Sequence, residues 1–115
     1  MIYTSYFANW RKFPQGKKLV SIANFPPKGF KGDRYEALFP DKSMFFQYKD
    51  GEIDEETFKV LYRNQLDKLD REQILQDLDE CILLCYEKSS DFCHRHIVRE
   101  WLGEKNIQEL KGNKQ

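Results

Sequence analysis

The residues of this chain that are best suited to chemistry gather in one stretch, CILLCYEKSSDFCHRHIVREWL (residues 81–102), which holds all three cysteines and both histidines. Thiols and imidazoles bind zinc, which needs about four such ligands in tetrahedral reach. However, Cys81 and Cys85 lie four residues apart in an apolar run, roughly 13 Å from each other on a strand. His94 and His96 would not share a helix face. The spacing therefore argues against a metal site.

Cys93 is the cysteine best placed to be reactive. It lies where a helix is expected to begin, and His94 and Arg95 follow it. A helix N-terminus and nearby cationic side chains favour thiolate over thiol. Cys93 and Arg99 also match the loose Cys-x5-Arg pattern of cysteine phosphatases, but the residues between them lack the glycine usual there. The alternative is a small buried residue at the helix start, with His94 and Arg95 in solvent.

Other side chains of the same stretch could assist. Arg95 and the helix N-terminus could hold an anion without covalent chemistry. Glu87 follows the apolar run and would share a strand face with Cys85. A carboxylate there could orient His94 or Arg95, act as a general base, or only form a salt bridge at the loop edge.

The surrounding pattern alternates strands and helices. Strands are expected at 2–8, 19–23 and 81–86, with a last short strand at 106–110. Helices are expected over 41–48, after the N-caps Asp54 and Asp70, and from Cys93 to a C-cap at Gly103, with their apolar stripes in the core. This order predicts a small single α/β domain over residues 1–110, with a mainly parallel sheet of three to four strands flanked by helices. Residues 111–115 are expected to form a loose tail.

Sites in parallel sheets lie beyond the carboxyl ends of the strands. The loops after the first two strands, at 9–12 and 25–40, would open on the same edge as the turn after residue 86. These loops carry polar and basic side chains that could add contacts to an anion held by Arg95: Asn9, Arg11, Lys28, Lys31 and Arg34.

Composition narrows the setting. The chain has 19 basic and 19 acidic residues and zero net charge, so no global field favours nucleic acid or acidic lipid. We see no signal peptide, no apolar run of membrane-spanning length and no evident disulfide framework among three cysteines. We therefore expect a cytoplasmic protein with free thiols, no membrane partner, no cofactor and no metal.

The stretch LLCYEKSSDFCHRHIV resembles the signature of domain-of-unknown-function family four-eight-eight. That signature has a buried strand ending in Cys-x-Glu, a polar turn, and Cys-His-Arg at a helix start. The matching positions are Cys85, Glu87, Cys93, His94 and Arg95. The resemblance continues more weakly in IYTSYFA and YEALFPDKSMFFQYKDGEID. After the second strand, Ser21-Ile22-Ala23-Asn24 lacks the Asp-Val-Arg of longer members, so the chain is similar to the shorter branch. The resemblance implies a small α/β fold and supplies no reaction.

Three functions compete. The first is binding or processing of a phosphate-bearing ligand, either a nucleotide or small molecule or a nucleic-acid end, with Cys93, Glu87, His94 and Cys85 at the reacting centre. The second is a non-catalytic module whose aromatic and basic loop, residues 25–40, docks a protein or single-stranded nucleic acid. The third is a thiol redox or sensor protein that uses Cys85 and Cys93. The first is the expected function.

Overall fold

The chain forms a parallel sheet with helices packed on it. The computed structural model describes residues 1–14, 16–87 and 92–110, and only the backbone of residues 10–12. The expected tail at 111–115 and the polar turn at 88–91 lie outside these residues. The elements in chain order are β1 (Ile2–Tyr6), η1 (Phe7–Lys12), β2 (Lys18–Ser21), β3 (Asp33–Arg34), η2 (Glu36–Leu38), α1 (Lys42–Lys49), α2 (Glu55–Leu66), α3 (Arg71–Asp77), β4 (Cys81–Cys85), α4 (His94–Leu102) and β5 (Ile107–Glu109).

The sheet confirms the expected α/β fold. Its strand order is β3-β2-β4-β1-β5, and every neighbouring pair is parallel. All five residues of the central strand β4 are buried, as its continuous apolar run predicted. The sheet has five strands instead of three or four, because β3 lies within the loop at 25–40. With two exposed residues, β3 is too short to produce an alternating pattern.

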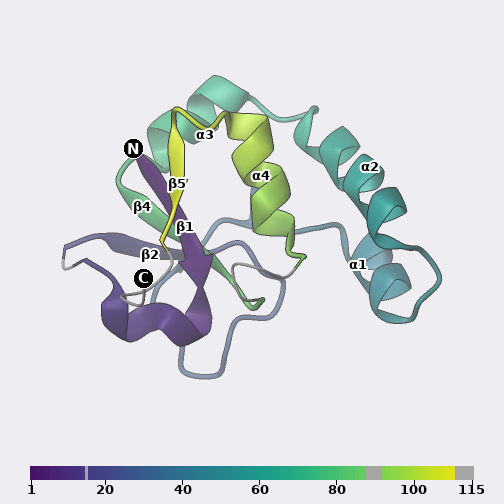
Figure 1. The fold of residues 1–115 in the computed structure, drawn as a ribbon, viewed down its shortest axis with the longest axis horizontal. Helices are drawn as coiled ribbons and strands as arrows, with labels where there is room; N and C mark the ends of the chain where they lie inside the picture. Colours follow the sequence, from purple (N-terminus) through teal and green to yellow (C-terminus); the bar gives the residue numbers. More distant parts are fainter. Residues whose placement is uncertain (15, 88–91, 111–115) are drawn as a thin grey trace.

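Alternate residues of β4 face two different hydrophobic layers. Cys81 and Leu83 pack with apolar residues of the helices, which cover one face of the sheet. Ile82 and Leu84 pack with Phe7, Ala23 and other residues of η1 and the loop after β2, which cover the opposite face. Figure 1 shows α4 beside the sheet and α2 beyond it. The site therefore lies in a strand that is covered on both sides.

The helix boundaries follow their capping residues. Asp54 and Asp70 accept hydrogen bonds from the first turns of α2 and α3, which confirms both expected N-caps. Gly103 ends α4 with φ +95°, a conformation that favours glycine. Leu61 is a departure from the expected core stripes, because it is 38% exposed and lines a hollow between α1 and α2.

The carboxyl ends of β1, β2 and β4 lie on one edge of the sheet. Tyr6, Ser21 and Cys85 end these strands, and the parallel register aligns them. None of the helices within the described ranges is long and apolar enough to cross a membrane. The chemistry-bearing stretch thus begins at the edge where parallel sheets place their sites.

Candidate functional site

The junction between β4 and α4 is closed by a disulfide between Cys85 and Cys93. Cys85 is the last residue of β4, and Cys93 is the N-cap of α4. The disulfide therefore holds the start of α4 against the end of β4. The expectation of free thiols is therefore wrong for this pair. It holds for Cys81, which is free and buried at the other end of β4.

The side chain of Arg95 is wholly buried beside this disulfide. Its Nη2 and Nε donate to the two carboxylate oxygens of Glu109 at 2.9 Å and 3.2 Å, a two-pronged ion pair. Its Nη1 donates to the backbone oxygen of Glu87 at 2.7 Å and to Sγ of Cys85 at 3.0 Å. The side chains of Arg95 and Glu109 are 0% and 4% exposed. Protein groups thus engage the guanidinium from several sides, and its role as an anion ligand stays a prediction.

Glu109 is the residue of this site that sequence reasoning missed. It lies in β5, opposite Thr4 of β1, whose Oγ1 donates to Glu109 Oε1 at 2.6 Å. The signal was weak: Ile107 and Glu109 share a strand face, so a carboxylate is carried inward beside a buried apolar residue. A buried arginine needs a carboxylate partner, but nothing in the spacing links positions 95 and 109.

His94 is held as a neutral ring on the other side of the disulfide. Its Nε2 lies 2.7 Å from the backbone oxygen of Ile22, which only accepts, so Nε2 carries the proton. Nδ1 is then unprotonated and lies 3.9 Å from Sγ of Cys93. The pKa of His94 is lowered to about 4, mainly by burial and also by the positive charge of Arg95, against the raising effect of the Ile22 bond.

A narrow pocket leads to this side of the site. It has a volume of about 30 Å³ and is lined by Glu87, Cys93 and His94 together with aromatic residues that include Phe58 and Phe92. Cys85 does not line this pocket and is 0% exposed. Cys93 lines it but is itself buried, with 2% of its surface exposed.

Three other residues were expected to add contacts from neighbouring loops. Asn9 is buried, and its Nδ2 donates to Ser5 and to the backbone oxygen of Leu110. Arg34 is exposed on the edge strand β3. The side chain of Arg11 lies outside the described residues. The roles of these three residues as contacts to an anion therefore stay predictions.

Lys28 and Lys31 line a separate pocket over the face of the sheet opposite the helices. Its volume is about 480 Å³, and Phe7, Phe30 and Leu84 form its apolar wall. Gly32 holds the loop close to β2, because a Cβ at this position would lie 2.4 Å from the backbone oxygen of Leu19. The loop at 25–40 therefore packs closely against β2, and its residues form one wall of this pocket.

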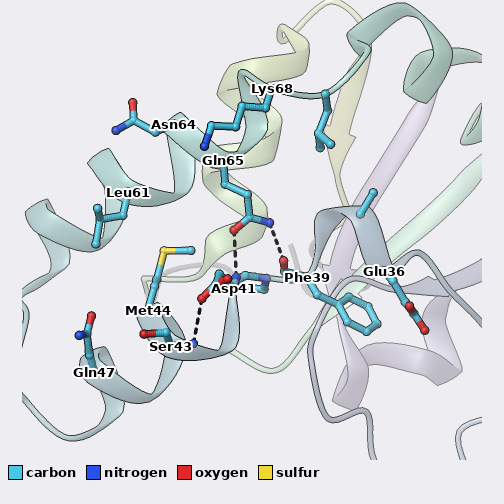
Figure 2. Close-up of a pocket in the computed structure, with 13 residues that line it drawn as sticks. Glu36, Phe39, Asp41, Ser43, Met44, Gln47, Leu61, Asn64, Gln65 and Lys68 are labelled. Carbon is cyan, nitrogen blue, oxygen red and sulfur yellow. Dashed lines mark hydrogen bonds between the residues drawn. The ribbon is translucent and has the colours of Figure 1, made fainter.

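A larger hollow lies between α1, α2 and the segment around η2. It has a volume of about 910 Å³, and Figure 2 shows Gln65 at its centre. The amide of Gln65 donates to the backbone oxygen of Phe39 at 2.7 Å and accepts from the backbone N–H of Asp41 at 2.9 Å. Its lining includes none of the expected site residues. The residues predicted to form the site therefore lie outside this hollow.

Comparison with known proteins identifies a family. A family model described as the active DUF488-N3 subclade matches residues 7–106, which include β2, β3, β4 and the disulfide. No curated protein and no solved structure matches the chain. The expected family is therefore confirmed, whereas the chemistry of the Cys-x-Glu and Cys-His-Arg residues stays a prediction.

The buried ion pair predicts a large effect from a change of charge alone. Glu109→Gln keeps the shape of the side chain but leaves the guanidinium of Arg95 buried without a carboxylate. We expect a loss of about 3–5 kcal/mol in the free energy of unfolding, measured by urea denaturation. Glu100→Gln, on the exposed side of α4, is the matched control and should change stability by less than about 0.5 kcal/mol. Equal stabilities of the two variants would contradict the account.

The neutral His94 predicts a pH dependence of stability. Its pKa of about 4 in the folded protein lies below the ordinary 6.5, so the unfolded chain binds the proton more tightly. This contribution is complete above about pH 6.5 and is lost as the pH falls toward 4. The loss is about 3 kcal/mol.

Unfolding free energies between pH 4 and 8 measure this contribution. The slope between pH 4 and 6.5 should flatten in His94→Asn and persist in His96→Asn. NMR can follow the titration of the His94 ring in the folded protein. A titration midpoint near 6.5 would contradict this contribution to stability.

Proposed function

We propose that this chain, which belongs to the DUF488 family as a member of its active DUF488-N3 subclade, acts through reversible reduction of the Cys85–Cys93 disulfide. The observation that supports this most directly is the position of the pair. The disulfide joins a strand end to a helix start, with a guanidinium nitrogen 3.0 Å from Cys85 Sγ. This is the thiol redox or sensor alternative of the sequence analysis, and the disulfide is the reason for preferring it here.

The proposed reaction is an exchange with a dithiol. A thiolate of the dithiol attacks Sγ of Cys93, the Cys85–Cys93 bond breaks, and Cys85 leaves with the electron pair as a thiolate. In the mixed disulfide, the first sulfur of the dithiol is bonded to Cys93 Sγ. The second thiolate of the dithiol then attacks that first sulfur and releases Cys93 as a thiolate. The protein disulfide gains two electrons and the dithiol loses two, so the products are a protein dithiol and an external disulfide.

The surroundings of each sulfur fit its part in this exchange. Cys93 lines the narrow pocket and Cys85 does not, so an attacking thiolate would approach the buried pair from the side of Cys93. Cys85 is buried, but the guanidinium of Arg95 donates to its Sγ, and positive charge stabilises a leaving thiolate. After reduction, the unprotonated Nδ1 of His94 is positioned to accept a hydrogen bond from the Cys93 thiol.

The redox function predicts distinct reactivities for the thiols. In reduced Cys81→Ser protein, we expect Cys93 to react with iodoacetamide before Cys85. The pH at which the alkylation rate of Cys93 is half-maximal should lie below the ~8.5 pKa of a free cysteine. The same variant, equilibrated with mixtures of reduced and oxidised dithiothreitol, should pass between two thiols and one disulfide in a single two-electron step. A Cys93 midpoint at or above ~8.5, or a pair that stays reduced in every mixture, contradicts the proposal.

A second function is supported by the pocket of about 480 Å³. A phosphate-bearing ligand with an aromatic ring matches its lining, because Phe7 and Phe30 offer ring contacts and Lys28 and Lys31 offer ammonium groups. The two phenyl rings meet edge to face with centroids 5.3 Å apart. In this proposal the anion is bound by Lys28 and Lys31 on the sheet face that lies opposite the helices. It is not bound by Arg95 at the carboxyl ends of the strands.

Lysine substitutions test this second function. With adenosine and guanosine monophosphates as probes, we expect chemical-shift changes at Phe7, Phe30 and Leu84, and weaker binding at higher salt. Lys28→Glu with Lys31→Glu should weaken binding about tenfold or more. Lys105→Glu, exposed near β5, is the control for charge alone and should leave binding unchanged. Shift changes that occur only elsewhere, or equal losses in both variants, contradict a ligand site here.

A further inference from the structure

The disulfide and His94 form a cluster that also contains potential metal ligands. Cys85, Cys93 and His94 each offer one ligand atom, and these atoms lie within 4.8 Å of one another. The sequence spacing is unfavourable for a metal held by Cys81 with Cys85 or by His94 with His96. The fold groups a different set of ligands, because the disulfide brings the end of β4 and the start of α4 together.

The imidazole of His94 is oriented as a metal ligand requires. In metal sites, the nitrogen that does not bind the ion usually donates to a carbonyl or carboxylate, which fixes the ring and its tautomer. Nε2 of His94 makes such a bond to the backbone oxygen of Ile22 at 2.7 Å. This leaves the lone pair of Nδ1 on the side of Cys93, whose Sγ is 3.9 Å away.

The sulfur atoms reach ligand spacing after one change. Two thiolates on a tetrahedral zinc, with Zn–S bonds of about 2.3 Å, lie about 3.8 Å apart. Reduction of the Cys85–Cys93 bond allows its two sulfur atoms to move to this separation. Arg95 Nη1 already donates to Cys85 Sγ at 3.0 Å, a contact that supports a ligating thiolate, while Glu109 balances the charge of the guanidinium.

The fourth coordination position would face the narrow pocket. Cys93 and His94 line that pocket, and the side chain of Glu87 is beside them. Three protein ligands with one open position are the arrangement of catalytic zinc sites, in contrast to the closed four-ligand structural sites. A small ligand or water could occupy the open position.

We propose that the reduced form of this protein binds one thiophilic divalent cation, Zn²⁺ in particular, through Cys85 Sγ, Cys93 Sγ and His94 Nδ1. Formation of the disulfide releases the ion. With a small disulfide as oxidant, the two bound thiolates lose two electrons and form the Cys85–Cys93 bond. The oxidant gains these electrons and leaves as two thiolates, and Zn²⁺ is set free. The inference shares with the proposed function only the need for a reducible pair, not the exchange with a dithiol.

Cobalt titration tests the site directly. The full chain with Cys81→Ser is reduced while unfolded, refolded under a phosphine reductant, and titrated with Co²⁺ as the probe. We expect one equivalent to bind with thiolate-to-cobalt charge-transfer absorption, and Zn²⁺ to displace it. The same chain in its oxidised form is the matched control and should show no such absorption.

Single substitutions identify the ligands. Cys85→Ser and Cys93→Ser should weaken Co²⁺ binding more than ~100-fold, beyond the 10–100-fold typical of residues that only support ligands, and His94→Asn should weaken it at least tenfold. His96→Asn should leave it unchanged. Circular dichroism checks that each variant folds. If a variant does not fold, the comparison of cobalt binding between the reduced and oxidised Cys81→Ser chain still tests the metal site.

The outcomes also separate this inference from the proposed function. Absence of charge-transfer absorption in the reduced, folded protein overturns the metal site, even where the same sample exchanges normally with dithiothreitol. Binding that persists equally in the oxidised protein overturns it as well. Loss of dithiol exchange together with intact cobalt binding removes the proposed function and leaves the metal site standing.

Discussion

The guanidinium of Arg95 lies inside this protein, and the arrangement of the site depends on how that charge is satisfied. Removing an arginine from water is costly, so the fold must bring a carboxylate and further acceptors to it. Glu109 supplies the carboxylate at 2.9 Å, and the end of β4 supplies a backbone oxygen and a sulfur. One side chain thus connects α4, β5 and β4, and Thr4 of β1 connects to the same network through Glu109.

This constraint fixes the distances on which the proposed chemistry relies. Arg95 belongs to the first turn of α4, so holding its head group also fixes the start of the helix where Cys93 and His94 lie. The bond from His94 to the backbone oxygen of Ile22 fixes the same turn against the chain that follows β2. The two sulfur atoms therefore face each other because two polar contacts, on opposite sides, define the position of the helix start. The ion pair has a mainly positional role, since buried pairs are weak sources of net stability.

Much of the fold follows from local patterns in the sequence. The apolar run of β4, the caps Asp54 and Asp70, and the glycine after α4 each reflect a short-range rule, and the structure has those elements where the rules place them. β3 was missed because two residues carry no periodicity. Its pairing depends on the path of a long loop instead of on its own side chains.

The site was harder to predict, because its contacts join residues that are distant in sequence. The resemblance singled out Cys85, Glu87, Cys93, His94 and Arg95, whose functional roles stay predictions. The partner of Arg95 lies fourteen residues away on another strand. Glu109 has no motif of its own. The pairing of Cys85 with Cys93 was hidden by the odd number of cysteines and by an expectation of free thiols. The disulfide joins the end of β4 to the start of α4, a closure that no local pattern in the sequence predicts.

The central claim is that this network joins Cys85 to Cys93 and leaves Cys81 alone. The most direct test is to purify the protein without reductant, unfold it in guanidinium chloride with an excess of a thiol-alkylating reagent, and locate the labels by peptide mass spectrometry. The account predicts one label, on Cys81, and a linked peptide that contains Cys85 and Cys93, with three labels after prior reduction. Three labels without reduction, or a linked peptide that contains Cys81, would contradict it.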